Sequence, residues 1–423
     1  MFLNWKFPKL FYGWWIVGAA FLVALFVSGT VVYGFTAIFE PMVDDLGWSY
    51  TQISAAASLR GLETGIFAPL TGLLTDRWGP KRLVFGGIVC VILGLVVLSY
   101  TSSLALFYVA FFLIALGTSG TTAIVMMTAV ANWFRKKVGL ASGIVASGFG
   151  CSGLMVLVMV RLIDLYDWRV TLLILALSML ILALPLSFLF RHKPEQYGYL
   201  PDGQASSQIT FDNDTDLSQD VEVEVGVAEA IRSKAFWHIA MAYAFHMAVI
   251  SAVITHIMPA LSSAGITRSI SGVVATILPL VSIGGRLGLG WLGDKFERRW
   301  VTAGALGIEA LGLLCFGYVA VAGTWLLILF LVLFGVGYGG CAVMWPTLSR
   351  EYFGRKKFGT IFGFMIGVNT IGSVFGPVFA GWGYDNWGSY QSIWFIFAGL
   401  ALAALITMLT VSPSPVRTLS KIA

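Results

Sequence analysis

Charged side chains are scarce in this chain. Asp, Glu, Lys and Arg make up 11% of its 423 residues, whereas water-soluble domains carry about 25%. So few charges could not cover a soluble protein of this length, which excludes a soluble enzyme. The chain has four cysteines without CxxC spacing, and four histidines without the spacing of metal ligands. A disulfide scaffold is therefore excluded, and we predict no metal site and no cofactor.

Apolar residues take the place of the missing charges. They make up 58% of the chain and gather in runs of the length, about 20 residues, that a helix needs to cross a bilayer. Backbone groups in lipid must be satisfied within the span, which favours helices. The sequence therefore predicts an all-α membrane protein with 12 transmembrane helices. The runs are residues 13–38, 54–74, 83–100, 104–131, 139–163, 170–190, 235–261, 271–292, 301–321, 325–347, 359–381 and 392–411.

Basic residues predict the orientation. Of the 26 Lys and Arg, 21 lie in the N-terminal segment, in the loops that follow even-numbered runs, and in the C-terminal segment. Because cytoplasmic loops carry the excess of Lys and Arg, we expect both termini and the central loop to be cytoplasmic. The membrane would be a bacterial inner membrane or a plasma membrane. The net charge of +5 then reflects topology, so we predict membrane lipids and no nucleic acid as partners.

One polar segment divides the chain into two halves. Residues 191–234 hold nine of the 21 acids, which is typical of a solvated linker between an N-terminal half (1–190) and a C-terminal half (235–423). The sequence GLLTDRWGPKR (72–82) matches GWLGDKFERR (290–299) at an offset of 218. WFRKKVGLASG (133–143) matches FGRKKFGTIFG (353–363) at an offset of 220. Two motifs at nearly one offset indicate an internal duplication, which predicts a solute site near the midplane, between the halves.

These motifs carry a family resemblance. Gly72–Arg82 resembles the signature loop of the major facilitator superfamily. YGWW (12–15), NWFRKKVGLASGIVASGFGCSG (132–153) and THIMPALSSAGIT (255–267) resemble its monocarboxylate transporter and oxalate–formate antiporter branch. The resemblance implies the major facilitator fold, with two pseudo-symmetric six-helix halves. It also implies secondary transport, by alternating access, of a small organic anion such as lactate, pyruvate or formate, through proton symport or anion exchange.

The chain departs from that branch at three places. Tyr12 and Ser282 stand where eukaryotic monocarboxylate carriers have acids, and residues 359–381 contain no counterpart of the lysine in span eleven of the oxalate exchanger. The proton route that uses the acid at the Ser282 position is therefore not carried over. A second fixed cation for a dicarboxylate is also missing there.

Arg286 is the strongest candidate for binding substrate. It lies eight residues before Asp294, or about 12 Å inside the membrane from the cytoplasmic end of its helix. No acid stands three or four residues from it. A guanidinium at this depth suits a carboxylate, and the resembled branch holds the substrate carboxylate with an arginine here. The alternative is a structural ion pair with Glu309, at comparable depth.

Other charges are predicted to form structural or gating pairs. Arg60 and Glu63 share one helix face and can neutralise each other, with a gating role as the alternative. Arg161 and Asp164 have the same spacing. The loops with Asp76 and Asp294 resemble cytoplasmic latches.

Polar groups near mid-membrane complete the candidate site. His246 could carry a coupling proton or donate to a substrate hydroxyl, and the others could orient the solute. The alternative for all of them is helix packing. The set is His246, Asn369, Tyr338, Tyr33, Thr118 and Ser119.

Other functions remain open at this point. If Arg286 pairs with Glu309, the cavity carries no net charge and export of drugs or neutral solutes gains support. A membrane sensor that binds without transporting is a further alternative. No span contains a catalytic constellation, so we predict no enzyme. The predicted partners are a small carboxylate and, under symport, protons; the carrier is expected to be a monomer.

Overall fold

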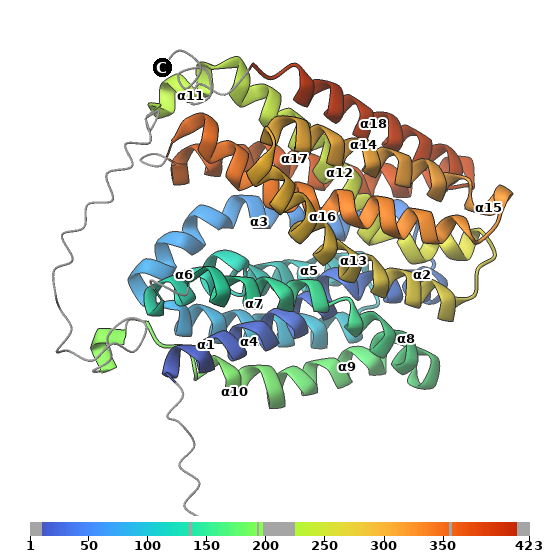
Figure 1. Cartoon of the computed structure of the whole chain (residues 1–423). Coiled ribbons are helices and arrows are strands. Elements are labelled where there is room, and N and C mark those ends of the chain that lie inside the picture. Colours follow the sequence, from blue (N-terminus) through green and yellow to red (C-terminus); the bar gives the residue numbers. More distant parts are fainter. Residues whose placement is uncertain (1–10, 135–137, 193, 198–224, 355–357, 413–423) are drawn as a thin grey trace, which may run out of the picture.

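The chain folds into two groups of helices that run along one common direction. The computed structural model describes residues 11–134, 138–192, 194–197, 225–354 and 358–412, and within these ranges it contains helices and no strand. Helices α1 to α10 form one half and α11 to α18 the other (Figure 1). We call the end of the bundle where α1 and α12 begin the linker end, and the opposite end the far end.

Most of these helices could span a bilayer. Ten of the described helical segments are long and apolar enough, and α5 is a shorter apolar helix. The predicted all-α membrane fold is confirmed, and each predicted run falls mainly within helix. The N-terminal half consists of α1 (Tyr12–Ser28), a π-helix (Gly29–Tyr33), α2 (Phe35–Leu46), α3 (Tyr50–Trp78), α4 (Pro80–Ser99), α5 (Leu104–Ser119), α6 (Ala123–Trp133), α7 (Val138–Cys151), α8 (Leu154–Tyr166), α9 (Trp168–Ser178), a second π-helix (Met179–Ala183) and α10 (Leu184–Ser187).

The C-terminal half repeats this arrangement with longer unbroken helices. A short 3-10 helix (Pro194–Tyr197) follows the first half, and residues 198–224 of the predicted linker lie outside the described residues. The helices are α11 (Val227–Arg232), α12 (Lys234–Ser263), α13 (Arg268–Lys295), α14 (Arg298–Gly317), α15 (Val319–Ala322), α16 (Leu326–Phe353), α17 (Phe358–Trp387) and α18 (Gln391–Leu409).

The fourth predicted span is not one continuous helix. α5 ends at Ser119 and α6 begins at Ala123, with Thr122 in an extended conformation between them. The break follows a close approach to α4, since a Cβ on Gly117 would lie 2.5 Å from the carbonyl oxygen of Gly87. The hydropathy of the run could not show this, because it reports length and polarity but not the contacts of glycines.

Glycines also bring the two halves into contact. Gly150 lies against Ile283, where an added Cβ would come within 2.9 Å of its side chain, and Gly153 packs on Pro279. The GxGxxG pattern at residues 148–153 therefore serves helix packing. Because α13 contacts α7 here, one face of α13 is turned toward the N-terminal half.

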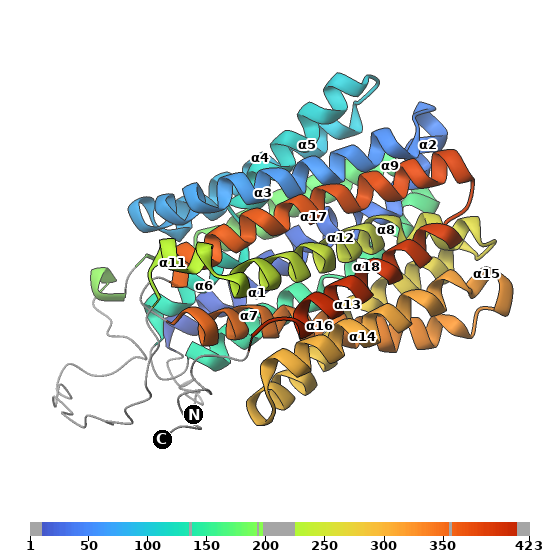
Figure 2. The ribbon, with the colours of Figure 1, turned by 90° about the horizontal axis from the view of Figure 1, so that it is seen from above.

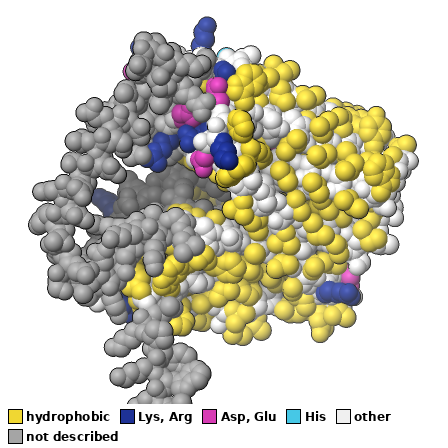
Figure 3. Space-filling view, in the orientation of Figure 1, with side chains coloured by type: hydrophobic (Ala, Val, Ile, Leu, Met, Phe, Trp, Pro, Cys, Tyr) yellow, Lys and Arg dark blue, Asp and Glu magenta, His cyan; other side chains and the backbone are white. Residues whose placement is uncertain are grey.

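The halves are joined by hydrogen bonds at the far end. Asp385, near the end of α17, accepts hydrogen bonds from the backbone amides of Tyr50 (3.1 Å) and Thr51 (2.9 Å), in the first turn of α3. α3 and α17 lie side by side (Figure 2). At the linker end the molecule is hollowed between the halves, with charged side chains on the rim (Figure 3). Within the described residues, the halves are thus joined at the far end and leave a hollow between them at the linker end.

Candidate functional site

Arg286 lies on the face of α13 that is turned toward the N-terminal half. Pro279 and Ile283, which contact α7, precede it by seven and three residues, and this spacing places all three on one stripe. Arg286 is one turn closer to the linker end, where the halves separate. Its side chain is partly buried and, within the described residues, makes no ion pair; its Nε is buried without a hydrogen-bond partner. A cation at this depth is costly, so the absence of a counter-charge favours a ligand-binding role.

Tyr33 and Tyr338 meet across the halves beside this arginine. Their hydroxyls are 3.1 Å apart, and Tyr33 is buried. Tyr33 ends the π-helix in the first span, and Tyr338 lies in the middle of α16. The Val336 backbone contacts Gly285, the residue before Arg286, so α16 brings Tyr338 close to the part of α13 that carries the arginine. Two of the predicted orienting residues are therefore brought together next to Arg286.

Glu309 pairs with His246 and not with Arg286. His246 Nδ1 lies 2.8 Å from Glu309 Oε2, and the exposed fractions of the two side chains are 1% and 0%. The alternative in which Glu309 neutralises Arg286 thus finds no support in the described contacts. His246 belongs to α12 and Glu309 to α14, and both side chains are buried; the role of His246 at the solute stays a prediction.

Cys341 completes a group of three possible metal ligands with this pair. Ligand atoms of His246, Glu309 and Cys341 all lie within 4.8 Å of one another, and all three residues are buried. Histidine, carboxylate and thiolate are ligand types that zinc accepts. The direct hydrogen bond between His246 and Glu309 already satisfies one atom of each, so a metal would have to replace it. The sequence did not reveal this group, because its members come from three separate helices.

Asn369 is buried without hydrogen bonds. Its exposed fraction is 3%, and neither amide atom has a partner within the described part of the chain. The Thr30 hydroxyl, in the π-helix that ends at Tyr33, is also buried without a hydrogen-bond partner among the described residues. Buried polar groups are nearly always paired with protein or water. Both side chains therefore have free capacity for water or a polar solute.

Thr118 and Ser119 are satisfied within their own helix. The Thr118 hydroxyl donates to the carbonyl of Ala115 (2.9 Å), and that of Ser119 to Leu116 (2.7 Å). They lie between Gly117 and Gly120, which both contact α4. The helix-packing alternative accounts for these two residues.

The predicted charge pairs have mixed outcomes. The side chains of Arg60, Glu63 and Asp76 lie outside the described residues. The side chain of Asp294 is 79% exposed and comes only to 4.0 Å from that of Arg298. The expected pairing of Arg161 with Asp164 is wrong.

Asp164 is instead bound by the other half of the molecule. Arg268 Nε lies 3.3 Å from Asp164 Oδ1, and Arg268 Nη2 donates to the carbonyl of Ala37 (2.6 Å). Arg268 begins α13 and Asp164 is near the end of α8, so the ion pair joins the two halves at the far end. Spacing along one helix could not show this competing partner.

His256 and Asp385 are the functional candidates that sequence reasoning missed. His256 is fully buried and lies 3.0 Å, through Nε2, from both Ser54 Oγ in α3 and the Pro377 carbonyl in α17. It therefore joins the halves near the same end as Asp385. His256 lies within the THIMPALSSAGIT motif, but neither the motif nor the sequence around Asp385 shows these contacts, because each residue acts on a helix from the opposite half.

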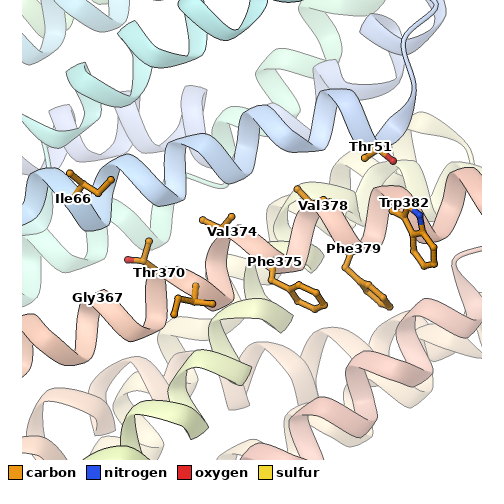
Figure 4. A pocket seen from close by; sticks show the side chains of 10 residues that line it. Thr51, Ile66, Gly367, Thr370, Val374, Phe375, Val378, Phe379 and Trp382 are labelled. Atoms are coloured by element: carbon orange, nitrogen blue, oxygen red, sulfur yellow. The ribbon is translucent and has the colours of Figure 1, made fainter. Parts of the chain in front are cut away.

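A groove on the side of the bundle is unrelated to Arg286. Its volume is about 770 Å³, and it lies between α3 and α17 (Figure 4). Apolar side chains such as Ile66, Phe375 and Trp382 line it, and all three are largely exposed. Such a surface suits lipid chains, and the described residues that line it carry no charge for a carboxylate.

Comparison with known proteins agrees with the helical architecture. The family model of the Major Facilitator Superfamily matches residues 21–285 and 239–422. In a solved structure, a bacterial homologue of the human lysosomal transporter Spinster shares the fold, with a TM-score of 0.70 and 18% identity over 97% of this chain and 100% of that one.

Two relatives are similar along most of their length. The oxalate:formate antiporter of Oxalobacter formigenes is 26% identical over 365 residues, which is 86% of this chain and 83% of that protein. Monocarboxylate transporter 12 of Xenopus laevis is 24% identical over 404 residues, which is 92% of this chain and 86% of that protein. Together with the two family-model matches, which cover nearly the whole chain, these similarities lead to one conclusion: the protein is a multi-pass membrane transporter that belongs to the Major Facilitator Superfamily.

Proposed function

We propose that this transporter carries a small organic monoanion and binds its carboxylate at Arg286. The observation that supports the proposal is a guanidinium at mid-bundle, between the halves, without an ion pair in the described part of the chain. The planar fork of arginine can donate two parallel hydrogen bonds to one carboxylate. Tyr33, Tyr338 and Asn369 would then orient the remainder of the solute. The names of the two relatives, which concern oxalate, formate and monocarboxylates, point to the same class.

Transport would proceed by rocking of the two halves around this site. The far-end hydrogen bonds would break and the linker end would close as the site changes sides. We place the linker end in the cytoplasm, in line with the excess of Lys and Arg in the predicted cytoplasmic segments. Either anion exchange or symport with one proton would keep the loaded carrier electrically balanced.

Ligand-induced stabilisation tests the proposal. Purified protein would be heated with lactate, pyruvate, formate or oxalate, and with neutral controls of similar size. A ligand at 100 times its dissociation constant should stabilise the protein by about 2.7 kcal/mol. We expect a rise in Tm with at least one carboxylate and none with the neutral solutes, and Arg286→Ala should abolish the rise.

A second arginine provides the matched control. Arg161 also lies within a membrane helix but is exposed, on α8. Arg161→Ala should keep the response to carboxylates. A full response in Arg286→Ala, or stabilisation by the neutral solutes alone, would show that the carboxylate site is assigned wrongly.

A further inference from the structure

A second groove, on the N-terminal half, combines apolar walls with one basic end. It lies among α3, α4 and the end of α5, and its volume is about 480 Å³. Apolar side chains such as Phe67, Leu74, Leu83 and Leu116 line it. Arg82 is the one charged side chain among the described residues of this lining. The groove is therefore amphipathic, unlike the one between α3 and α17.

The groove faces away from the C-terminal half. Ser58 marks the side of α3 that meets α17, because its hydroxyl donates to the carbonyl of Val374 (2.6 Å). Phe67 follows nine residues later, and nine residues turn a helix by about two and a half turns, so Phe67 lies on the opposite side. α3 accordingly lies between α17 and α4 (Figure 2). Phe85 of α4 and Leu116 of α5, both apolar, are each 37% exposed. On the outside of a membrane-spanning bundle such side chains face lipid.

The groove is as deep as one leaflet of a bilayer. Trp78, at the linker end of α3, follows Phe67 by eleven residues, which is about 16 Å of helix. The hydrocarbon core is about 30 Å thick, so one leaflet accounts for about 15 Å. The Trp78 side chain is 55% exposed, and tryptophans at the ends of spans are typical of the headgroup level. One acyl chain thus fits along the groove, with its headgroup beside Trp78.

Positive charge gathers where that headgroup would lie. Arg82, in the first turn of α4, is exposed and makes no ion pair within the described part of the chain. Lys81 is exposed beside it, with its ammonium 5.3 Å from the centre of the Phe188 ring. Arg77, near the end of α3, is exposed as well. Basic pockets at the membrane surface attract anionic lipids, and a guanidinium suits a phosphate.

We propose that the groove between α3 and α4 binds an anionic phospholipid of the leaflet at the linker end. One acyl chain lies along the helices from Phe67 to Trp78, and the phosphate contacts Arg82. The chain packs against the end of α5, next to the break in the fourth span. The inference goes beyond the proposed function and does not depend on it, because the groove lies on the side of α3 that is turned away from the other half.

Native mass spectrometry of delipidated protein tests the headgroup contact. The probes are dioleoyl phosphatidylglycerol, which has a net negative charge, and dioleoyl phosphatidylcholine, which has the same chains and no net charge. We expect the unaltered protein to bind the first lipid about fivefold more tightly, as one basic contact would give. Arg82→Gln should remove this preference. Arg232→Gln, at an exposed position on α11, should keep it.

A glycine gives access to the apolar part of the groove. Gly86 lines it, and a Cβ added there would meet no atom within 4 Å, so the side chain in Gly86→Leu enters open space. Leucine also favours the helix more than glycine does, and the variant should fold. We expect it to weaken binding of both lipids by about fivefold or more, because the acyl chain loses buried surface. Gly304→Leu, at an exposed and equally open position on α14, should weaken neither.

The outcomes separate the lipid from simpler ligands. Equal binding of the two lipids by the unaltered protein would overturn the site, as would a preference that survives Arg82→Gln. Unchanged binding in Gly86→Leu would show that the acyl chain lies elsewhere. Glycerol phosphate, which has the charge without the chains, should not displace phosphatidylglycerol at equal concentration. Displacement by it would indicate a site for a free anion and would refute the lipid.

Discussion

At the scale of single residues, the chemistry of Arg286 depends on the shape of its side chain as well as its charge. If the guanidinium holds a carboxylate through two hydrogen bonds, lysine cannot replace it, because an ammonium group is a point charge. We expect Arg286→Lys to bind formate or lactate at least tenfold more weakly than the unaltered protein, a loss of about 1.4 kcal/mol. Titration calorimetry would measure it.

The control for that variant is a neighbour without charge. Tyr33→Phe removes the hydroxyl that contacts Tyr338 and leaves the arginine intact, so it should weaken binding less than Arg286→Lys does. If lysine binds the anion as well as arginine does, the contact is a simple charge attraction and the bidentate geometry is refuted.

The sequence identified which residues carry charge inside the membrane, but not which of them meet. Arg286, Glu309 and His246 could be found from hydropathy because ionisable groups interrupt apolar runs. Depth along a helix can also be counted. The helix toward which a side chain points cannot be derived from the sequence. His246 and Glu309, which form a pair, are 63 residues apart in the chain. For the same reason, spacing predicts a partner for Asp164 on its own helix, whereas Arg268 reaches it from the other half.

At the scale of helices, the first turn of α3 is completed by a carboxylate from α17. The amides at a helix N-terminus lack partners within the helix and favour negative charge. We expect Asp385→Asn to weaken this cap by about 1 kcal/mol. The amides of Tyr50 and Thr51 should then exchange hydrogen roughly fivefold faster, as measured by mass spectrometry.

An aspartate that caps a helix within one half is the matched control. Asp167 accepts a hydrogen bond from the amide of Val170 (2.9 Å) at the start of α9. Asp167→Asn should increase exchange there and leave α3 unchanged. Unaltered exchange at α3 in Asp385→Asn would mean that the far end is held closed without this contact.

The limits of the element predictions also have a physical cause. Runs of apolar residues located the helices well, since spanning length is set by the bilayer. They could not locate the π-helix at residues 29–33 or the break after Ser119, because both depend on contacts with neighbouring helices.

At the scale of the whole molecule, the orientation in the membrane is open to a direct test. Basic residues predict that the C-terminus lies in the cytoplasm. A fluorescent protein fused to Ala423 should therefore fluoresce, and alkaline phosphatase fused there should be inactive. A phosphatase fusion after Gly265, at the far end, should be active. An active phosphatase at Ala423 would reverse the orientation and would place the hollow on the opposite side.

The contacts that join the two halves at the far end are largely hydrogen bonds between a side chain of one half and a main-chain group of the other. Asp385 holds two amides of α3, Ser58 donates to the carbonyl of Val374, and Thr36 accepts from the amide of Met258. A main-chain partner is present whatever residue evolution places there. A substitution of the residue that supplies the main-chain group therefore needs no compensating substitution in the opposite half. Among homologues, these contacts should leave isolated invariant positions and few correlated substitutions, even though they join the two halves.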